Sequence, residues 1–193
     1  MKYLGTNFLL ITSLSLLAFV ATAEDNALVK NTQEARALVK TFGSDLKHVL
    51  KTAMKSEGPI KALTVCNIEA GPIADKNSSL SGWKIGRTSL KVRNESNAPD
   101  KWESTVLYAF EKRKAAGENL KTMEYSETVK SGDKTVFRYM KPIPTAGLCL
   151  SCHGNVLGAE ITQKVQTLYP NDTATGFTVG DIRGAFTLTK TID

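Results

Sequence analysis

The feature that most constrains this chain is a short run of reactive side chains, Cys149-Leu150-Ser151-Cys152-His153. Two thiols at this spacing can each add to one vinyl group of the same porphyrin, and the histidine that follows is then held beneath the iron as its proximal ligand. Cys-x-x-Cys-His is the attachment pattern of a c-type haem. The run therefore predicts one covalent haem c bound by Cys149, Cys152 and His153, with the rest of the chain folded as its housing.

Two other interpretations of the same run are a thioredoxin-like redox dithiol and half of a zinc site. A redox dithiol is expected within a strand-helix unit, and a zinc site needs further cysteine or histidine ligands. The chain contains one further cysteine, Cys66, and one further histidine, His48. Haem attachment is therefore the favoured interpretation, and the other two stay open.

Residues 1–23 have the pattern of a secretory signal peptide. Lys2 gives a basic start, residues 8–20 form an apolar run, and Ala21-Thr22-Ala23 is a small-residue cleavage site. The apolar run is shorter than the roughly 20 residues that a membrane-spanning helix needs. We therefore expect cleavage after Ala23, a periplasmic or secreted protein without a membrane span, and a single domain over residues 24–193. Covalent haem attachment belongs to the same compartment.

The formal net charge of the chain is +6. The basic residues are spread through mixed sequence, so they are consistent either with an ordinary solvated surface or with a docking patch for an acidic redox partner. A glycine-rich phosphate loop, a recognition-helix pattern and an internal repeat are all missing from the sequence, which argues against nucleotide binding, nucleic-acid binding and a solenoid fold.

Helical periodicity dominates the first half of the chain. Residues 26–56 have apolar side chains at steps of three and four, which predicts a long amphipathic helix with a bend or break at Gly43. Gly58-Pro59 should close this helix and open a second one that ends at Gly71-Pro72. The apolar face of the first helix comprises Ala35, Leu38, Val39, Phe42, Leu46, Val49, Leu50 and Ala53; that of the second comprises Ile60, Leu63, Cys66 or Asn67, and Ala70.

A third helix is predicted after a polar, turn-rich stretch. Asp100, followed three residues later by Glu103, has the pattern of a capped helix start, and Gly117 is the expected stop. The buried stripe of this helix should be Trp102, Val106, Ala109 and Phe110. A further short helix is predicted after Gly158, ending at Pro170.

Strand patterns cluster in the second half. Residues 83–93 alternate imperfectly and predict a strand, while residues 120–130 and 134–140 predict a hairpin around Ser131-Gly132-Asp133. Residues 176–192 suggest a final hairpin with a turn at Gly180-Asp181. These elements together predict an α+β domain with an antiparallel sheet and N-terminal helices.

The stretch that leads to the haem motif contains two prolines. Pro142 and Pro144 lack the backbone N–H of a paired strand, so residues 141–147 should form an extended loop that delivers Cys149 to the porphyrin.

The sixth ligand of the iron is less constrained by the sequence. Cys66 is an odd cysteine in an oxidising compartment, and it falls on the inward face of its helix, so it is a candidate axial ligand. An inert buried thiol is the plainer explanation, because cysteine packs like a small hydrophobe. The competing ligands are His48, which should face water, Met54, at the edge of the apolar stripe, and Met123 and Met140, for which core packing is the commoner role.

The chain resembles bacterial and cyanobacterial c-type haem proteins that have a PAS-like domain and His/Cys axial ligation. The matching runs are Thr64-Val65-Cys66-Asn67, Gly86 to Asn94, Pro99-Asp100-Lys101-Trp102-Glu103, Cys149 to His153, and Gly180 to Ala185. The resemblance implies a PAS-like antiparallel sheet, with Cys66 as the distal and His153 as the proximal ligand. The family also occurs as the sensory ectodomain of membrane-bound signalling proteins, but the sequence shows neither a transmembrane nor a kinase segment.

Thiolate ligation has an electronic consequence. An anionic ligand favours ferric over ferrous iron, so a Cys66 thiolate should lower the reduction potential relative to Met/His ligation. Displacement of Cys66 on reduction would open a site for a small gas. Arg87, Lys91 and Arg93 form a cationic cluster that could pair with the haem propionates, although a solvated strand face explains it equally well.

The function predicted from the sequence is that of a secreted monohaem c-type cytochrome, acting in electron transfer or redox sensing with a separate redox partner protein. The alternative is a haem-based gas or redox sensor that signals through another protein. A haem enzyme such as a peroxidase would need acid-base residues beside an open distal position, and His48 is the only histidine to spare. We therefore do not expect catalysis.

Overall fold

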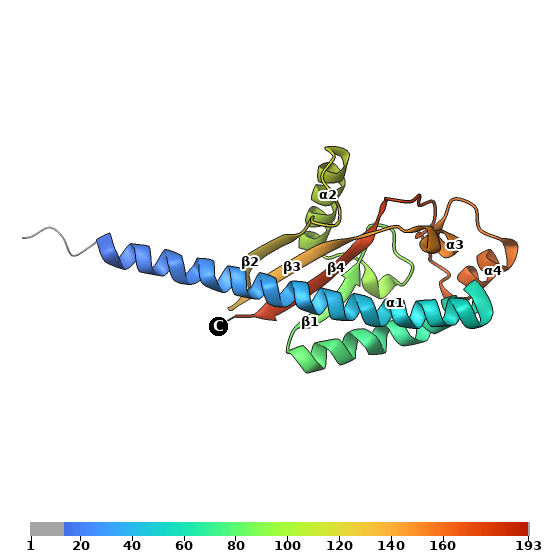
Figure 1. Ribbon diagram of the computed structural model, residues 1–193, viewed down its shortest axis with the longest axis horizontal. Helices are drawn as coiled ribbons and strands as arrows, with labels where there is room; N and C mark the ends of the chain where they lie inside the picture. Colours follow the sequence, from blue (N-terminus) through green and yellow to red (C-terminus); the bar gives the residue numbers. More distant parts are fainter. Residues whose placement is uncertain (1–13, 193) are drawn as a thin grey trace, which may run out of the picture.

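The computed structural model describes residues 14–192, with side chains from residue 25 onward. A long helical hairpin, α1, spans Leu14–Ser81 and runs along the whole molecule (Figure 1). At Gly58 the backbone leaves the helical region, with φ 76° and ψ −164°, and the chain turns back on itself. A positive φ of this kind is easy for glycine and costly for other residues. The predicted break at Gly58-Pro59 is therefore confirmed, and it divides α1 into arm 1, residues 14–57, and arm 2, residues 59–81.

Two details of α1 differ from the sequence predictions. Gly43 does not interrupt arm 1: a Cβ there would lie 3.1 Å from the Phe186 ring, so the glycine gives this aromatic side chain room. Gly71-Pro72 does not end arm 2, which continues to Ser81 with Pro72 inside the helix. The cost of the proline is offset by the packing of Ile73 and Ala74, which follow it, against the main core cluster.

Four strands form one antiparallel sheet: β1 (Lys84–Thr88), β2 (Tyr125–Ser131), β3 (Lys134–Pro144) and β4 (Ile182–Thr191). Their order is β1-β4-β3-β2, so the last strand of the chain lies between the first and the third. The predicted hairpin is β2 with β3, turning at Gly132. The fold is α+β, as the sequence predicted.

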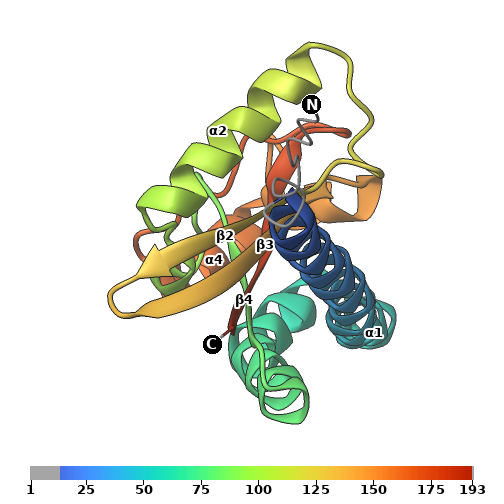
Figure 2. The same cartoon turned by 90° about the vertical axis from the view of Figure 1, so that its left-hand side faces the viewer.

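Helices cover both faces of this sheet (Figure 2). Arm 1 packs its apolar stripe on one face, where Phe42, Phe137 and Leu188 are fully buried. Helix α2 (Lys101–Ala115) covers the other face, packing Phe110 against Met140. The predicted capping box of α2 is present. Its stripe differs in one position, because Leu107 is buried and the predicted Ala109 is exposed.

Three strand predictions need correction. Strand β1 ends at Thr88, where the chain turns and the single Ser89 hydroxyl hydrogen is shared between the Lys91 and Arg183 carbonyls. The loop predicted over residues 141–147 is wrong up to Pro144, where β3 ends. Pro142 pairs with β4 on one side, while β2 has already ended on the other. A proline is tolerated there because its missing N–H faces no strand.

The hairpin predicted over residues 176–192 is also wrong, because β4 is a single strand and residues 176–181 do not pair with it. The Asp181 carboxylate accepts from the Thr178 N–H at 2.7 Å, and the Asp181 carbonyl accepts from the Thr145 N–H at 2.8 Å. These bonds tie the segment into a turn against the end of β3. Within that segment, Phe177 forms an isolated parallel bridge with Gly154.

The remaining elements gather at the end of the molecule where α1 turns back (Figure 1). They are the short 3-10 helix η2 (Gly147–Cys149), α3 (Leu150–His153) and the predicted helix α4 (Ala159–Leu168); a further 3-10 turn, η1 (Glu95–Asn97), follows β1. We call this part, residues 145–181, the site segment. It contains the Cys-x-x-Cys-His run.

Most of the predicted signal peptide, residues 1–23, lies outside the described residues, and its cleavage stays a prediction. Within residues 14–192, no helix combines the length and the apolar character required to cross a membrane. The single-domain prediction for residues 24–193 likewise stays a prediction.

Candidate functional site

The Cys-x-x-Cys-His run folds into one tight turn formed by η2 and α3, which we call the attachment turn after its predicted role. Residues three apart on a helical turn share a face, so Cys149 and Cys152 lie on the same side. Gly154 ends the turn, and a Cβ at this position would come within 2.7 Å of the Leu150 carbonyl oxygen. The glycine therefore allows the chain to leave α3 closely, directly after His153.

His153 is held in one tautomer. Its Nδ1 lies 2.7 Å from the Ala174 carbonyl oxygen, and because a carbonyl can only accept, Nδ1 must carry the proton. The lone pair is then left on Nε2. Burial, assisted by the positive charges of Arg183 and Arg93, lowers the pKa of His153 to about 2. A neutral imidazole with its other nitrogen donating to a carbonyl is the form in which histidine binds a metal.

The segment that follows α4 supports His153 from a second side. The Phe177 N–H donates to the His153 carbonyl at 3.0 Å, and the Gly176 N–H donates to the Gly154 carbonyl at 3.1 Å. The Phe177 ring stands edge-on to the imidazole, with ring centroids 6.2 Å apart. Hydrogen bonds and an aromatic contact thus fix the orientation of the His153 side chain.

Cys66 reaches the same region from arm 2. Cys66 lies about one helical turn after Leu63. Leu63, Ile161 and Val165 form a small apolar cluster, and Cys152 packs against this cluster. Burial raises the pKa of the Cys66 thiol, and the nearby charges of Arg87 and Arg93 partly oppose this. The tertiary structure therefore brings Cys66 close to the attachment turn, although the two lie far apart in the sequence.

The competing iron ligands lie elsewhere. His48 is exposed on arm 1, as the periodicity predicted. Met123 and Met140 are fully buried in the cluster beneath α2, where they pack against Phe110. Met54 is half-buried on arm 1.

The two other interpretations of the motif gain no support from the geometry. A thioredoxin-like dithiol is expected in a strand-helix-strand unit with parallel strands, whereas the sheet of the described residues is antiparallel and the run lies on a short turn. Over residues 14–192, no three His, Cys, Asp or Glu side chains are grouped closely enough to hold a metal ion, so a zinc site lacks its further ligands.

Three arginines surround His153, and their charges all bear on its pKa: Arg87, Arg93 and Arg183. Burial lowers the pKa of Arg87 and brings that of Arg183 to about 10. Among the described residues one carboxylate, that of Asp172, forms a salt bridge with this group, and it pairs with Arg93. The Arg183 Nε and Arg93 Nη1 atoms are buried and have no hydrogen-bond partner among the described residues. A buried positive excess with unused N–H donors fits an anionic group such as a haem propionate.

The three residues of the predicted cationic cluster therefore have different partners in the folded protein. Arg87 remains beside Cys66 without a salt bridge to any described residue. The exposed Lys91 donates from Nζ to the Thr175 carbonyl at 3.2 Å. Arg93 instead binds the protein itself, through Asp172 and two backbone carbonyls.

Sequence reasoning missed several side chains of this region. Arg183 belongs to the Gly180 to Ala185 run, but its position beside His153 depends on the close approach of β4 to residues 89–91. There Arg183 Nη1 donates to the Lys91 carbonyl at 3.2 Å. Phe177 was expected in a strand, and its ring instead contacts Lys91 and Arg183, whose charged groups lie 5.2 Å and 5.3 Å from its centroid. No local sequence pattern could have singled out the Ala174 carbonyl.

The family model described as Tll0287-like, Tll0287, matches residues 20–190 of the chain. The chain belongs to the Tll0287-like family. Among solved structures it is similar to the crystal structure of the cyanobacterial heme-protein Tll0287, with 25% sequence identity and a TM-score of 0.63. The match covers 85% of this chain and 96% of that one. A comparison with curated proteins finds no match.

The matched region of this Tll0287-like chain contains the attachment turn, arm 2 and the three arginines. A groove of about 320 Å³ between the two arms of α1 is lined by none of the three cysteines and by neither His153 nor the three arginines. Its lining comprises His48, Val49, Thr52, Ala53, Ser56, Lys61, Val65 and Glu69. The chemistry of the chain is therefore concentrated at the site segment and at the part of arm 2 beside it.

Proposed function

We propose that this chain is a c-type haem protein that binds one covalent haem and serves in electron transfer or redox sensing rather than in catalysis. Cys149 and Cys152 would form the two thioether bonds, His153 would be the proximal ligand and Cys66 the distal ligand. Two findings support the proposal: membership of the Tll0287-like family, and similarity to a solved structure described as a cyanobacterial heme-protein.

The single observation that carries the proposal is the state of His153. Its Nδ1 donates to the Ala174 carbonyl at 2.7 Å, which leaves Nε2 as the ligating nitrogen, and both cysteines precede it on the same turn. A carbonyl acceptor at Nδ1 also raises the donor strength of the imidazole.

A bound haem would supply one-electron exchange between ferric and ferrous iron. The chain would hold the imidazole with Ala174 and keep water away with Phe177, while Arg87 and Arg183 would pair with the propionates. A thiolate from Cys66 would favour the ferric state and so lower the reduction potential.

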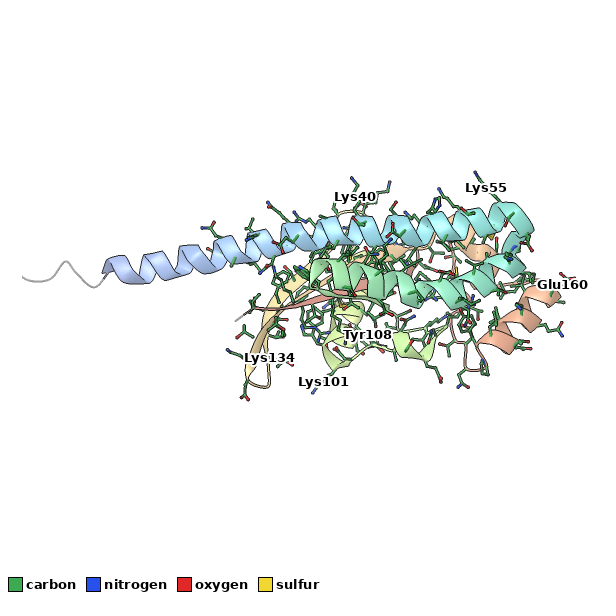
Figure 3. All side chains as sticks on the ribbon, turned by 90° about the horizontal axis from the view of Figure 1, so that it is seen from below. Lys40, Lys55, Lys101, Tyr108, Lys134 and Glu160 are labelled. Carbon is green, nitrogen blue, oxygen red and sulfur yellow. The ribbon has the colours of Figure 1, made fainter. Side chains whose placement is uncertain are left out.

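We also propose that the antiparallel sheet is a PAS-like scaffold, that the protein works in the periplasm or outside the cell, and that its redox partner is a separate protein. The outer side of arm 1 presents exposed lysines opposite the apolar stripe, including Lys40 and Lys55, which point away from the sheet in Figure 3. Together with Lys47 and Lys51 they offer a basic surface for an acidic partner.

A second candidate function is a haem-based gas or redox sensor. The observation that favours it is the environment of Cys66, whose pKa burial raises. A thiol that is easily protonated when the iron is reduced would leave the metal and open a position for a small gas. Carbon monoxide binding to the ferrous protein distinguishes this function from simple electron transfer.

The experiment that tests the proposal compares absorption and electron paramagnetic resonance spectra of wild type and Cys66→Ala, in ferric and ferrous states. We expect a low-spin thiolate signature in ferric wild type that disappears in Cys66→Ala. His48→Ala, which removes an exposed histidine, is the matched control and should keep the wild-type spectrum. An unchanged spectrum in Cys66→Ala would remove Cys66 from the iron, and a wild-type protein without covalent haem would refute the whole proposal.

A further inference from the structure

Arg93 and Asp172 form a salt bridge directly behind the attachment turn, which we name the Arg93–Asp172 clasp. We propose that this clasp is a positioning device that fixes the Ala174 carbonyl and thereby the orientation and donor strength of His153. The inference rests on the proposed haem function and assigns the Nε and Nη2 groups of Arg93 to the support of His153, which leaves only its Nη1 for a propionate.

The clasp connects three parts of the site. Arg93 donates from Nε and Nη2 to the two Asp172 oxygens, each at 3.1 Å. The same Nη2 donates to the Cys152 carbonyl at 2.7 Å and to the Ala174 carbonyl at 3.3 Å. One guanidinium therefore joins the attachment turn to the segment that supports His153.

The backbone of Ala174 is held at both its N–H and its carbonyl. Its N–H donates to Asp172 Oδ1 at 3.0 Å, while its carbonyl accepts from Arg93 at 3.3 Å and from His153 Nδ1 at 2.7 Å. Ala174 itself is fully buried, so water cannot replace these bonds. Any displacement of this peptide must change the hydrogen bond that orients the imidazole.

Backbone contacts support the clasp beside it. The Thr173 N–H donates to the Val92 carbonyl at 2.9 Å, and the Thr173 hydroxyl donates to the same oxygen at 3.1 Å. Residues 92–93 and 172–174 are thus fastened to each other by two adjacent sets of bonds. The loop after β1 serves as a rigid support for the histidine side of the site.

Burial indicates that the pair has a geometric role. The Arg93 and Asp172 side chains are 9% and 7% exposed, and a buried ion pair gains little net stability because desolvation opposes the Coulomb attraction. An arginine fork matches a carboxylate at two points, so it fixes direction as well as distance. A lysine would keep the charge and lose the fork.

The test uses Arg93→Lys and Asp172→Asn in the haem-loaded protein. Both should retain covalent haem but weaken the bond from His153 Nδ1 to Ala174, which makes the imidazole a poorer donor and shifts the midpoint potential upward. The ferric resonance spectrum should change at the same time. Asp172→Asn also removes a negative charge near the iron, which acts in the same direction.

The matched control is Arg138→Lys. Arg138 is similarly enclosed, with a side chain 14% exposed, and it pairs with Asp100 at 2.7 Å beside α2. This substitution should lower the melting temperature without moving the potential or the spectrum. If Arg93→Lys and Asp172→Asn lost stability in the same way with a wild-type potential and spectrum, the positioning role would be refuted.

The two proposals fail separately. A wild-type protein without covalent haem contradicts the proposed function, whereas a haem-loaded wild type with unresponsive clasp variants contradicts the clasp alone. If Arg93→Lys does not accumulate as folded protein, the near-isosteric Asp172→Asn decides by the ferric resonance spectrum, because the loss of its charge raises the potential whatever the orientation of His153.

Discussion

The sheet body and the site segment are held together in different ways. In the body, arm 1 and α2 enclose the sheet between large apolar side chains such as Phe42, Phe110 and Phe137, all fully buried. In the site segment, the apolar cluster is small, and buried arginines and backbone bonds fix the chain around His153. The stability of the body depends on the sum of many apolar contacts, whereas the geometry of the site segment depends on individual hydrogen bonds.

This difference has a physical reason. Apolar packing is non-directional and tolerates small rearrangements at modest cost, so it is suited to a scaffold. A metal ligand must be fixed in orientation, which requires directional hydrogen bonds and a second shell of partners. The three predictions that follow test whether the two regions are as independent as this account requires.

The largest effect is expected from Cys149→Ser/Cys152→Ser. Without either thiol no thioether bond can form, so haem staining of the denatured protein should be lost completely. Hydrogen exchange should accelerate in residues 145–181, while amides of β3 and β4 stay protected, because the body has its own core. Ser151→Ala, an exposed position between the two cysteines, should retain haem. Loss of protection in β3 and β4 as well would show that the regions fold as one unit.

A smaller effect in the opposite region is expected from Phe137→Ala. Phe137 is fully buried and packs edge-on against Trp83, with ring centroids 5.8 Å apart. Truncation should cost about 3–5 kcal/mol of unfolding free energy, measured by chemical denaturation. The absorption spectrum of the attached haem should remain that of wild type. Val179→Ala, at an exposed side chain, should change stability by less than about 0.5 kcal/mol. A shifted spectrum in Phe137→Ala would contradict the independence of the site.

The smallest effect is that of a change of one pH unit. The folded-state pKa of His153 is lowered to about 2 by burial, from an ordinary value of 6.5, so between these pH values the unfolded chain binds a proton that the folded chain does not. The stability of haem-free Cys149→Ser/Cys152→Ser should therefore fall as the pH drops below 6.5, by up to about 1.4 kcal/mol per pH unit. Denaturant titrations at several pH values measure this slope.

Adding His153→Gln to the haem-free variant should flatten that slope. In haem-loaded wild type, His153 should also contribute nothing to the pH dependence of stability, because Nε2 bound to iron cannot take the proton. An equally steep slope after His153→Gln would assign the pH dependence to other groups.

Local patterns in the sequence predicted much of the fold. The helix over residues 26–56, the break at Gly58-Pro59, the capping box at Asp100 and the hairpin at Gly132 each follow from periodicity or from one residue's conformational preference. These signals are local in sequence, so no knowledge of neighbouring elements is needed to interpret them.

The errors arose where tertiary contacts opposed a local rule. Pro72 lies within a helix because the residues after it pack on the core, and Pro142 lies within a strand because the sheet has an open side there. The expected final hairpin is missing because β4 pairs with β1 and β3, leaving the turn at Asp181 to bond with the end of β3.

The candidate site also has features that local sequence predicts and features that only tertiary contacts decide. The sequence by itself determined the attachment run, the inward position of Cys66 and the presence of a cationic cluster, because covalent spacing and helical periodicity are written in consecutive residues. The tertiary structure decided that Arg93 binds Asp172, that Arg87 and Arg183 remain without carboxylates among the described residues, and that the Ala174 carbonyl holds His153. Those contacts join residues distant in the chain, and the burial that makes each bond matter exists only once the chain has folded.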